Sequence, residues 1–98
     1  MPEFSTPHSV KKADTLFTES EMIRSIRFAI ASEYEAIQIY EEMIENISNK
    51  DAKTIIEEII TDEKVHVGNF LQLLKILNPD EDQYYKEGYK ETLELLEK

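Results

Sequence analysis

Apolar residues recur along the chain at alternating spacings of four and three residues. The first series runs through Ile26, Ile30, Glu33, Ile37, Tyr40, Ile44 and Ile47. The second series runs through Ala52, Ile56, Ile59, Glu63, His66, Phe70, Leu73 and Leu77. This spacing is typical of long helices that each bury one stripe. Both stripes, however, carry polar residues where an apolar side chain is expected.

Local signals place the ends of the two helices. Thr18 is followed three residues later by Glu21, which is the reciprocal capping pattern, so the first helix is expected over about 18–47. The polar break over 48–51 is too short for anything except a reversal of the chain direction. Asp51 is the expected cap of a second helix over about 51–77. Because the two helices are similar in length, they predict an antiparallel hairpin.

The two ends of the chain differ in character. After Pro79 a third, shorter helix is expected over about 82–96 as the last part of a helical domain spanning 18–98. Residues 1–17 hold no sustained period, which predicts an N-terminal arm with little fixed structure. The chain has no apolar run near the roughly 18 residues that a membrane span needs, nor a signal-peptide core. We therefore expect a cytoplasmic protein without a membrane partner.

Each long helix also carries apolar residues beside its main stripe. On the first helix these are Met22, Ala29, Ala36 and Met43, and on the second they are Ile60, Val67 and Leu74. With 98 residues, a lone core is only marginally stable. The expected fold is all-α: an antiparallel two-helix hairpin plus a shorter C-terminal helix. Two copies would form a homodimer with a ferritin-like four-helix bundle.

The composition of the chain limits its possible binding partners and metal ligands. The chain has 21 acidic and 11 basic residues, a net charge of −10 and no cysteine. This balance argues against nucleic acid, which requires a positive surface, and favours cations, although a solvated acidic surface would have the same composition. Without thiolates, the available metal ligands are carboxylates and imidazoles.

The polar residues on the two stripes make a candidate metal site. Glu33 lies on the first stripe, and Glu63 with His66 forms a Glu-x-x-His pair on the second. Burying such charges without a partner costs several kcal/mol, so a metal ion is expected. Two-metal centres in helical bundles take one Glu from each of two helices and Glu-x-x-His from each of the other two. This chain carries half of that set, and a two-fold dimer would complete it around two iron ions per interface.

Two segments resemble a known family. Ser-Glu-Tyr-Glu-Ala-Ile-Gln-Ile-Tyr-Glu over 32–41 and Asp-Glu-Lys-Val-His-Val-Gly-Asn-Phe over 62–70 are similar to the encapsulated ferritins, and the likeness spans about 21–78. The resemblance implies a ferroxidase that oxidises Fe(II) with O2 at a di-iron site between two subunits. It also implies a decameric ring inside an encapsulin nanocompartment, whose shell stores the iron.

The resemblance assigns roles to individual residues. Glu33, Glu63 and His66 match the iron ligands, Tyr40 matches a tyrosine beside the site, and Glu35 matches an acidic residue on the path by which metal arrives. Calcium, zinc or manganese would bind in place of iron or along that path. Glu33, Glu63, His66 and Tyr40 are thus the expected catalytic residues.

The chain also departs from the family. Ile39 stands where some members have Trp, and Ser32 replaces an acid that in some members helps to gather metal. Lys98 ends the chain without the small apolar tail of free-standing cargo. The chain is therefore expected to be either a truncation or the variant fused ahead of the shell protein.

Other interpretations remain open. The same site suits a peroxidase or catalase of the rubrerythrin or manganese-catalase type, although the absence of cysteine argues against rubrerythrin's iron–sulfur part. A helical oligomerisation module with a structural zinc or calcium ion is a non-enzymatic alternative. Tyr40 also fits an ordinary core position and Glu35 a surface position, while Gly68 is expected to allow close helix contact.

Overall fold

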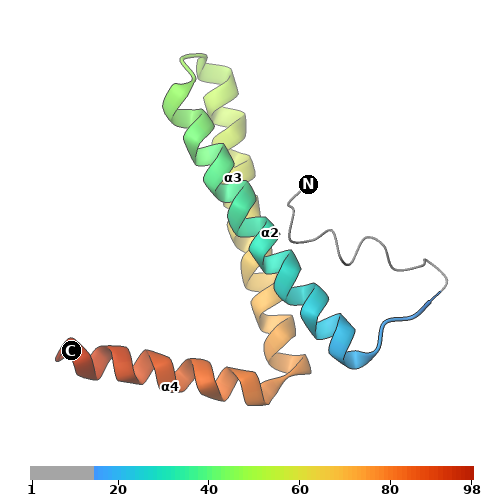
Figure 1. Cartoon of the computed structure of the whole chain (residues 1–98). Helices are drawn as coiled ribbons and strands as arrows, with labels where there is room; N and C mark the ends of the chain where they lie inside the picture. Colours follow the sequence, from blue (N-terminus) through green and yellow to red (C-terminus); the bar gives the residue numbers. More distant parts are fainter. Residues whose placement is uncertain (1–14) are drawn as a thin grey trace.

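The computed structural model describes residues 15–98, and this part of the chain forms three helices and no strand. The helices are α2 (Glu19–Asn46), α3 (Lys50–Leu77) and α4 (Pro79–Leu95). α2 and α3 run antiparallel as a long hairpin, and α4 turns away from its base at a steep angle (Figure 1). This arrangement confirms the all-α prediction of a hairpin with a shorter C-terminal helix. Most of the expected arm over 1–17 lies outside the described residues.

α2 begins where the capping pattern predicts. The Thr18 hydroxyl accepts a hydrogen bond from the Glu21 N–H at 3.1 Å, and the Glu21 carboxylate accepts one from the Thr18 N–H at 2.9 Å. This pairing satisfies two backbone donors that the first turn of a helix leaves unpaired. The helix ends at Asn46, one residue before the predicted boundary.

The predicted starts of the other two helices were wrong by one and three residues. Asn49, and not Asp51, caps α3, because its Oδ1 accepts a hydrogen bond from the Ala52 N–H at 2.9 Å. Asp51 lies instead in the first turn, where its charge favours the positive end of the helix. α4 begins at Pro79, because proline at the first helical position has no N–H to leave unpaired. It ends at Leu95, one residue early.

The hairpin core consists of two small aliphatic clusters. One contains Ile26, Ile30 and Leu74, and the other contains Ile37, Ile60 and Val67. The first helix therefore buries its predicted stripe, but the second buries the row that had been assigned to a flank. Ile59 and Leu73, predicted to face inward, stay 36% and 40% exposed. α3 is rotated so that its predicted stripe lies at the edge of the hairpin.

One broad side of the hairpin is consequently apolar and uncovered. We call it the open face, and its exposed members include Ile39, Met43, Ile59 and Leu73. Six residues make up the whole buried core of the described chain, and burial of an aliphatic side chain contributes roughly 2 kcal/mol. Such a core is small for a 98-residue chain, and it leaves the apolar residues of the open face exposed.

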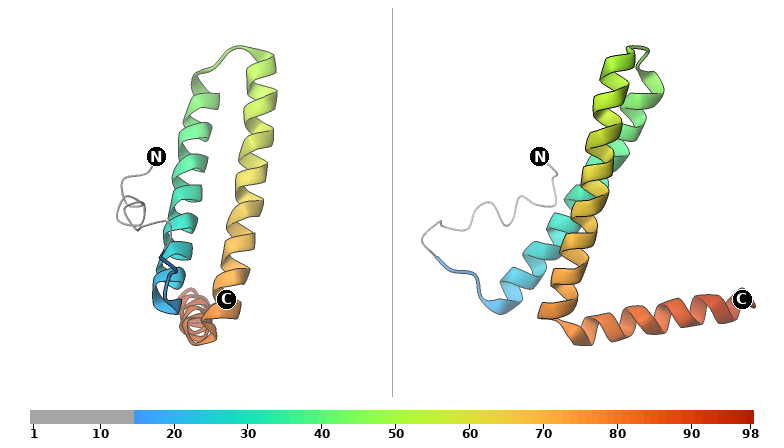
Figure 2. Two further views of the ribbon diagram at one scale, coloured as in Figure 1. Left: turned by 90° about the vertical axis from the view of Figure 1, so that its right-hand side faces the viewer. Right: turned by 180° about the vertical axis from the view of Figure 1, so that it is seen from behind.

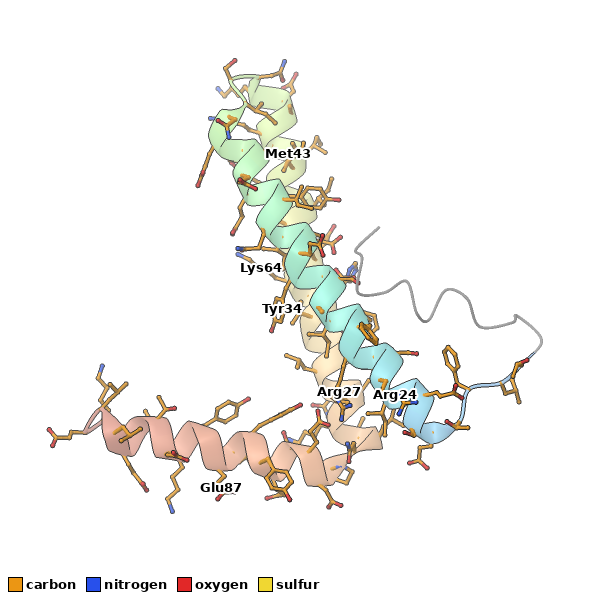
Figure 3. All side chains as sticks on the ribbon, viewed as in Figure 1. Arg24, Arg27, Tyr34, Met43, Lys64 and Glu87 are labelled. Atoms are coloured by element: carbon orange, nitrogen blue, oxygen red, sulfur yellow. The ribbon has the colours of Figure 1, made fainter. Side chains whose placement is uncertain are left out.

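α4 is attached to the hairpin by a polar network that the sequence patterns did not reveal. The Arg27 guanidinium on α2 donates to both carboxylate oxygens of Glu81, and the Tyr85 hydroxyl donates to the same carboxylate. The Asn78 side chain adds a hydrogen bond to Glu81 at 3.2 Å. Arg27 lies near the base of α2, where α4 begins (Figure 3). Viewed along α4, the two hairpin helices stand side by side above it (Figure 2).

Candidate metal centre

Glu33, Glu63 and His66 come together between the two long helices. One ligand atom from each lies within 4.8 Å of the others. The His66 Nδ1 atom is 3.6 Å from the Glu33 Oε2 atom and 4.0 Å from the Glu63 Oε2 atom. The Glu33 and Glu63 side chains are 19% and 20% exposed, and the His66 side chain is 48% exposed. The three residues that interrupt the apolar stripes therefore form one cluster.

Helical periodicity and the core clusters explain this convergence. Glu63 and His66 are three residues apart, which places both side chains on the same side of α3. Ile30 and Ile37 flank Glu33 along α2, and each belongs to a different core cluster. Glu33 consequently lies between the two aliphatic clusters along α2, and Glu63 and His66 lie between Ile60 and Val67 along α3.

The electrostatics of the cluster favour a bound cation. The Glu33 Oε2 atom is shielded from solvent and has no hydrogen-bond partner. Leaving a buried acceptor unpaired costs about 1–3 kcal/mol, and more for a charged group. A second carboxylate, from Glu63, points to the same place, so the two negative charges repel each other unless a cation lies between them. Two carboxylates and one imidazole suit iron, manganese or zinc.

Tyr40 and Glu35 border the same opening as the carboxylates. A hollow of about 300 Å³ lies beside the cluster, and its walls are Ser32, Glu33, Glu35, Ala36, Ile39, Tyr40 and Glu63. Tyr40 also packs against the cluster of Ile37, Ile60 and Val67, so it is both a core residue and a wall of the hollow. The Ser32 hydroxyl donates to the Phe28 carbonyl at 2.9 Å and so bonds to its own helix. His66 approaches the carboxylates from outside this hollow.

Ala36 is a residue of the site that the sequence patterns did not mark as functional. It lies in the wall of the hollow between Ser32 and Tyr40. The sequence feature that could have identified Ala36 is its small side chain, one turn from Glu33 and from Tyr40 on the apolar flank of the helix. A larger side chain at this position would narrow the space beside the two carboxylates.

A helical hairpin with Glu on one helix and Glu-x-x-His on the other has half of the ferritin-like carboxylate arrangement. The sequence model of the family described as Rubrerythrin matches residues 25–98. The crystal structure of the encapsulated ferritin domain from Pyrococcus furiosus superimposes with a TM-score of 0.82 at 32% identity, covering 89% of each chain. The chain therefore belongs to the encapsulated ferritin family, as its sequence resemblance indicated.

Two curated relatives agree with this assignment. A ferritin-like-encapsulin shell fusion protein of Pyrococcus furiosus is 34% identical over 82 residues, which are 84% of this chain and 24% of the relative. An encapsulin nanocompartment cargo protein of Myxococcus xanthus is 33% identical over 88 residues, which are 90% of this chain and 66% of the relative. The chain thus spans about a quarter and about two thirds of these two relatives. No helix within residues 15–98 is long and apolar enough to cross a membrane.

Proposed function

We propose that the protein is a ferroxidase that oxidises Fe(II) to Fe(III) with O2 at a di-iron site shared by two subunits. The observation that carries this proposal is the convergence of Glu33, Glu63 and His66 around a shielded carboxylate oxygen without a hydrogen-bond partner. The family assignment supports iron as the metal, because rubrerythrin-like and ferritin-like proteins are di-iron proteins.

A second subunit on the open face would complete the site. Three protein ligands from one chain do not surround an ion that takes four to six. The hollow beside the cluster includes Ile39, which is also an exposed member of the open face at 48% exposure. A second hairpin on this face would cover the exposed apolar residues. It would also double the ligands to four carboxylates and two imidazoles around two iron ions.

Each residue of the site would have its own role in the proposed oxidation of Fe(II). Glu33 and Glu63 supply hard oxygen donors, which favour Fe(III) over Fe(II), and His66 supplies a nitrogen donor for the ferrous substrate. Glu35 lines the hollow that leads to these carboxylates, and we assign it the first contact with arriving Fe(II). Tyr40 forms the wall of the same hollow, and we assign it a positioning role beside Glu33 and Glu63. Two Fe(II) ions would each give up one electron, and O2 would take up both electrons with two protons from water to form hydrogen peroxide.

The names of the two relatives support a location for the proposed reaction. One is named as a cargo protein of an encapsulin nanocompartment and the other as a fusion with the shell protein. We propose that this chain likewise works inside an encapsulin nanocompartment in the cytoplasm. There it would pass Fe(III) to the shell for storage as part of a ring of dimers, with a decamer as the expected size.

The direct test measures Fe(II) oxidation under air by the protein and its variants. Glu33→Ala, Glu63→Ala and His66→Ala should each reduce the initial rate by at least about tenfold while helicity is kept, because each removes an iron ligand. Glu58→Ala is the matched control, since it removes an exposed acid from the same helix. Full oxidation rates in all three ligand variants would refute the proposal.

The match to the rubrerythrin family makes peroxide reduction the second candidate. The same protein should therefore be given hydrogen peroxide and O2 in parallel at equal Fe(II). Faster consumption of peroxide than of O2 would favour the peroxidase assignment. Stoichiometric metal uptake without turnover by either oxidant would favour a structural site.

A further inference from the structure

The two methionines within residues 15–98 have different surroundings. Met22 is partly buried and packs against the core cluster that contains Leu74. Met43 lies on α2 toward the turn that joins this helix to α3, and it is 41% exposed (Figure 3). Peroxide oxidises the thioether of methionine to a sulfoxide, and an accessible thioether is attacked before a packed one. Met43 is therefore the methionine of the hairpin that is open to oxidation.

Met43 is also a neighbour of the hollow beside the metal cluster. Ile39 and Tyr40 form part of the wall of this hollow, together with the carboxylates of Glu33 and Glu63. Met43 comes four residues after Ile39 and three after Tyr40, and residues at these spacings are neighbours on the surface of a helix. The Met43 side chain therefore lies next to the space in which the proposed oxidation of Fe(II) would form hydrogen peroxide.

Met43 belongs to the open face as well. It shares this apolar face with the exposed side chains of Ile39, Ile59 and Leu73. Methionine suits such a face, because its flexible apolar side chain adapts to the surface that covers it. Its sulfoxide is polar, and burying a polar group without a hydrogen-bond partner is unfavourable. Oxidation of Met43 would therefore replace an apolar contact of the proposed dimer by an unfavourable one.

We propose that Met43 is a modification site for the hydrogen peroxide that Fe(II) oxidation forms, and that its sulfoxide weakens the dimer at the metal centre. One oxygen atom of the peroxide is transferred to the Met43 sulfur, the O–O bond breaks, and the other oxygen atom leaves as water. The sulfur loses two electrons and the peroxide gains them. Because two subunits complete the centre, a weaker dimer oxidises less Fe(II) and forms less peroxide. The inference rests on the ferroxidase and the dimer proposed above.

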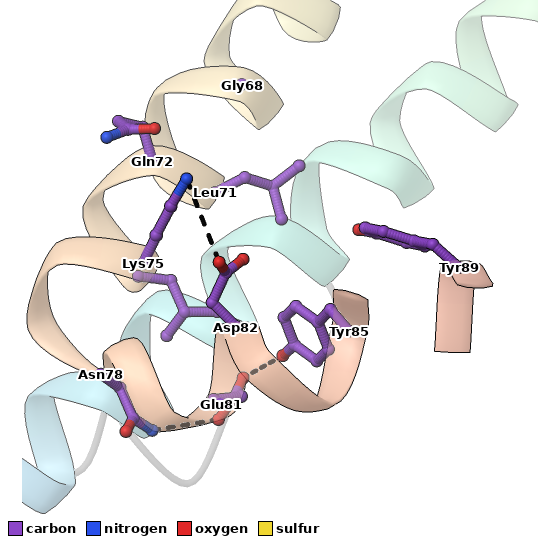
Figure 4. A pocket seen from close by; sticks show the side chains of 10 residues that line it. Gly68, Leu71, Gln72, Lys75, Asn78, Glu81, Asp82, Tyr85 and Tyr89 are labelled. Carbon is purple, nitrogen blue, oxygen red and sulfur yellow. Dashed lines mark hydrogen bonds and ion pairs between the residues drawn. The ribbon is translucent and has the colours of Figure 1, made fainter. Parts of the chain in front are cut away.

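Leu71 is a matched control position away from the open face. It is 42% exposed, about as much as Met43, and it borders the hollow between α3 and α4 (Figure 4). Leu71 and Leu73 are two residues apart on α3, which places them about 200° apart around the helix at 3.6 residues per turn. Leucine and methionine are similar in volume, so the double variant Met43→Leu/Leu71→Met should fold like the wild type. It moves the same oxidisable side chain off the open face.

The first experiment treats the iron-free protein with hydrogen peroxide. Peptide mass spectrometry should find one added oxygen atom on Met43 before any on Met22. Analytical ultracentrifugation should give a dimer dissociation constant about tenfold higher, and methionine sulfoxide reductases should reverse the change. Met43→Leu should keep its dimer under the same treatment. The double variant should keep it too, even when its methionine at position 71 is oxidised.

The second experiment replaces the added peroxide by Fe(II) in air. Met43 should gain oxygen in the wild type and stay unmodified in Glu63→Ala, which forms little peroxide. The inference is overturned if peroxide leaves Met43 unmodified, if its sulfoxide leaves the dimer dissociation constant unchanged, or if the untreated protein is monomeric. Equal loss of the dimer in the double variant, or Fe(II) oxidation that leaves Met43 unmodified, would also overturn it. A wild type that oxidises no Fe(II) would instead refute the ferroxidase proposal and leave the first experiment's result standing.

Discussion

The Nδ1 atom of His66 on α3 lies 3.6 Å from the Oε2 atom of Glu33 on α2. This carboxylate oxygen is shielded from water and has no hydrogen-bond partner. The pair thus joins the two helices at a point where apolar contact would otherwise be expected. In the absence of metal, the Glu33 carboxylate without a partner destabilises the hairpin. The same carboxylate lies at the centre of the proposed metal site.

Metal binding should stabilise the wild-type chain and not its Glu33→Gln variant. A metal at about 100 times its dissociation constant contributes about 2.7 kcal/mol to the free energy of unfolding. Thermal unfolding with Zn(II), which does not react with O2, should show the rise in Tm, and a chelator should reverse it. In metal-free protein Glu33→Gln should not lower Tm, since it removes a shielded charge. A clear drop in Tm would show that Glu33 is stabilised by something other than metal.

Dimer formation should depend on the open face. Leu73→Glu places a charge in an apolar patch that is 40% exposed in the single chain, and it should reduce both the dimer fraction and the Fe(II) oxidation rate by at least about tenfold. Val65→Glu, at a side chain that is 58% exposed on α3, is the matched control. Analytical ultracentrifugation at several concentrations gives the dimer fraction. Equal dimer fractions in the two variants would place the metal-site contact elsewhere.

The contact between Arg27 and Glu81 should make the attachment of α4 sensitive to acid. The hydrogen bonds that Arg27 donates are the main cause that lowers the pKa of Glu81 below its usual 4.5. Because the folded pKa lies below the unfolded one, the folded state binds fewer protons. The stabilisation is therefore present above about pH 4.5 and is lost as the pH falls through the lower, folded value.

Glu81→Gln tests this directly. It should lower the free energy of unfolding at pH 7 by at most about 1 kcal/mol, because Arg27 is half exposed. The difference between the variant and the wild type should shrink as the pH falls below about 4.5 and through the lowered pKa of Glu81. Urea unfolding at a series of pH values measures both effects, and a constant difference across that series would contradict the assignment.

Tyr85 should ionise later than an ordinary tyrosine. Burial, followed by the hydrogen bond to Glu81, raises its pKa to about 12. Since the folded pKa lies above the unfolded value of about 10, the stabilisation is complete below pH 10 and is lost as the pH rises through about 12. Tyr85→Phe should remove the change in tyrosinate absorbance near pH 12 and reduce stability by about 1 kcal/mol. An unchanged absorbance curve would show that another tyrosine is responsible.

The contact between helices should depend most on Leu74. It is the most buried side chain of the described chain, at 3% exposure, and it completes the cluster with Ile26 and Ile30. Leu74→Ala should lower the free energy of unfolding by about 2–5 kcal/mol. Ile76→Ala, at a side chain that is 66% exposed, should change it by no more than about 0.5 kcal/mol. Denaturant unfolding of both variants measures the difference.

Sequence patterns were sufficient to predict the hairpin and to select the three residues of the polar cluster between α2 and α3. The capping pair of Thr18 and Glu21 and the apolar period of each helix are local properties, and the structure keeps the cap and the predicted stripe of α2. Glu33, Glu63 and His66 could be selected because each interrupts an apolar stripe at a position that the helical period predicts to face the core. That argument needs no knowledge of the partner helix.

The tertiary structure decided how the helices are rotated and directed relative to one another, which local periodicity does not determine. The period of a helix determines which residues share a stripe, but the rotation of α3 against α2 depends on contacts between distant residues. The row of Ile60, Val67 and Leu74 therefore faces inward in place of the predicted stripe. The direction of α4 depends likewise on Arg27 meeting Glu81, a contact between residues 54 positions apart. The sequence by itself thus determined the helices and the candidate ligands. Packing between them decided which faces remain uncovered, because the rotation of one helix against another depends on contacts between distant residues.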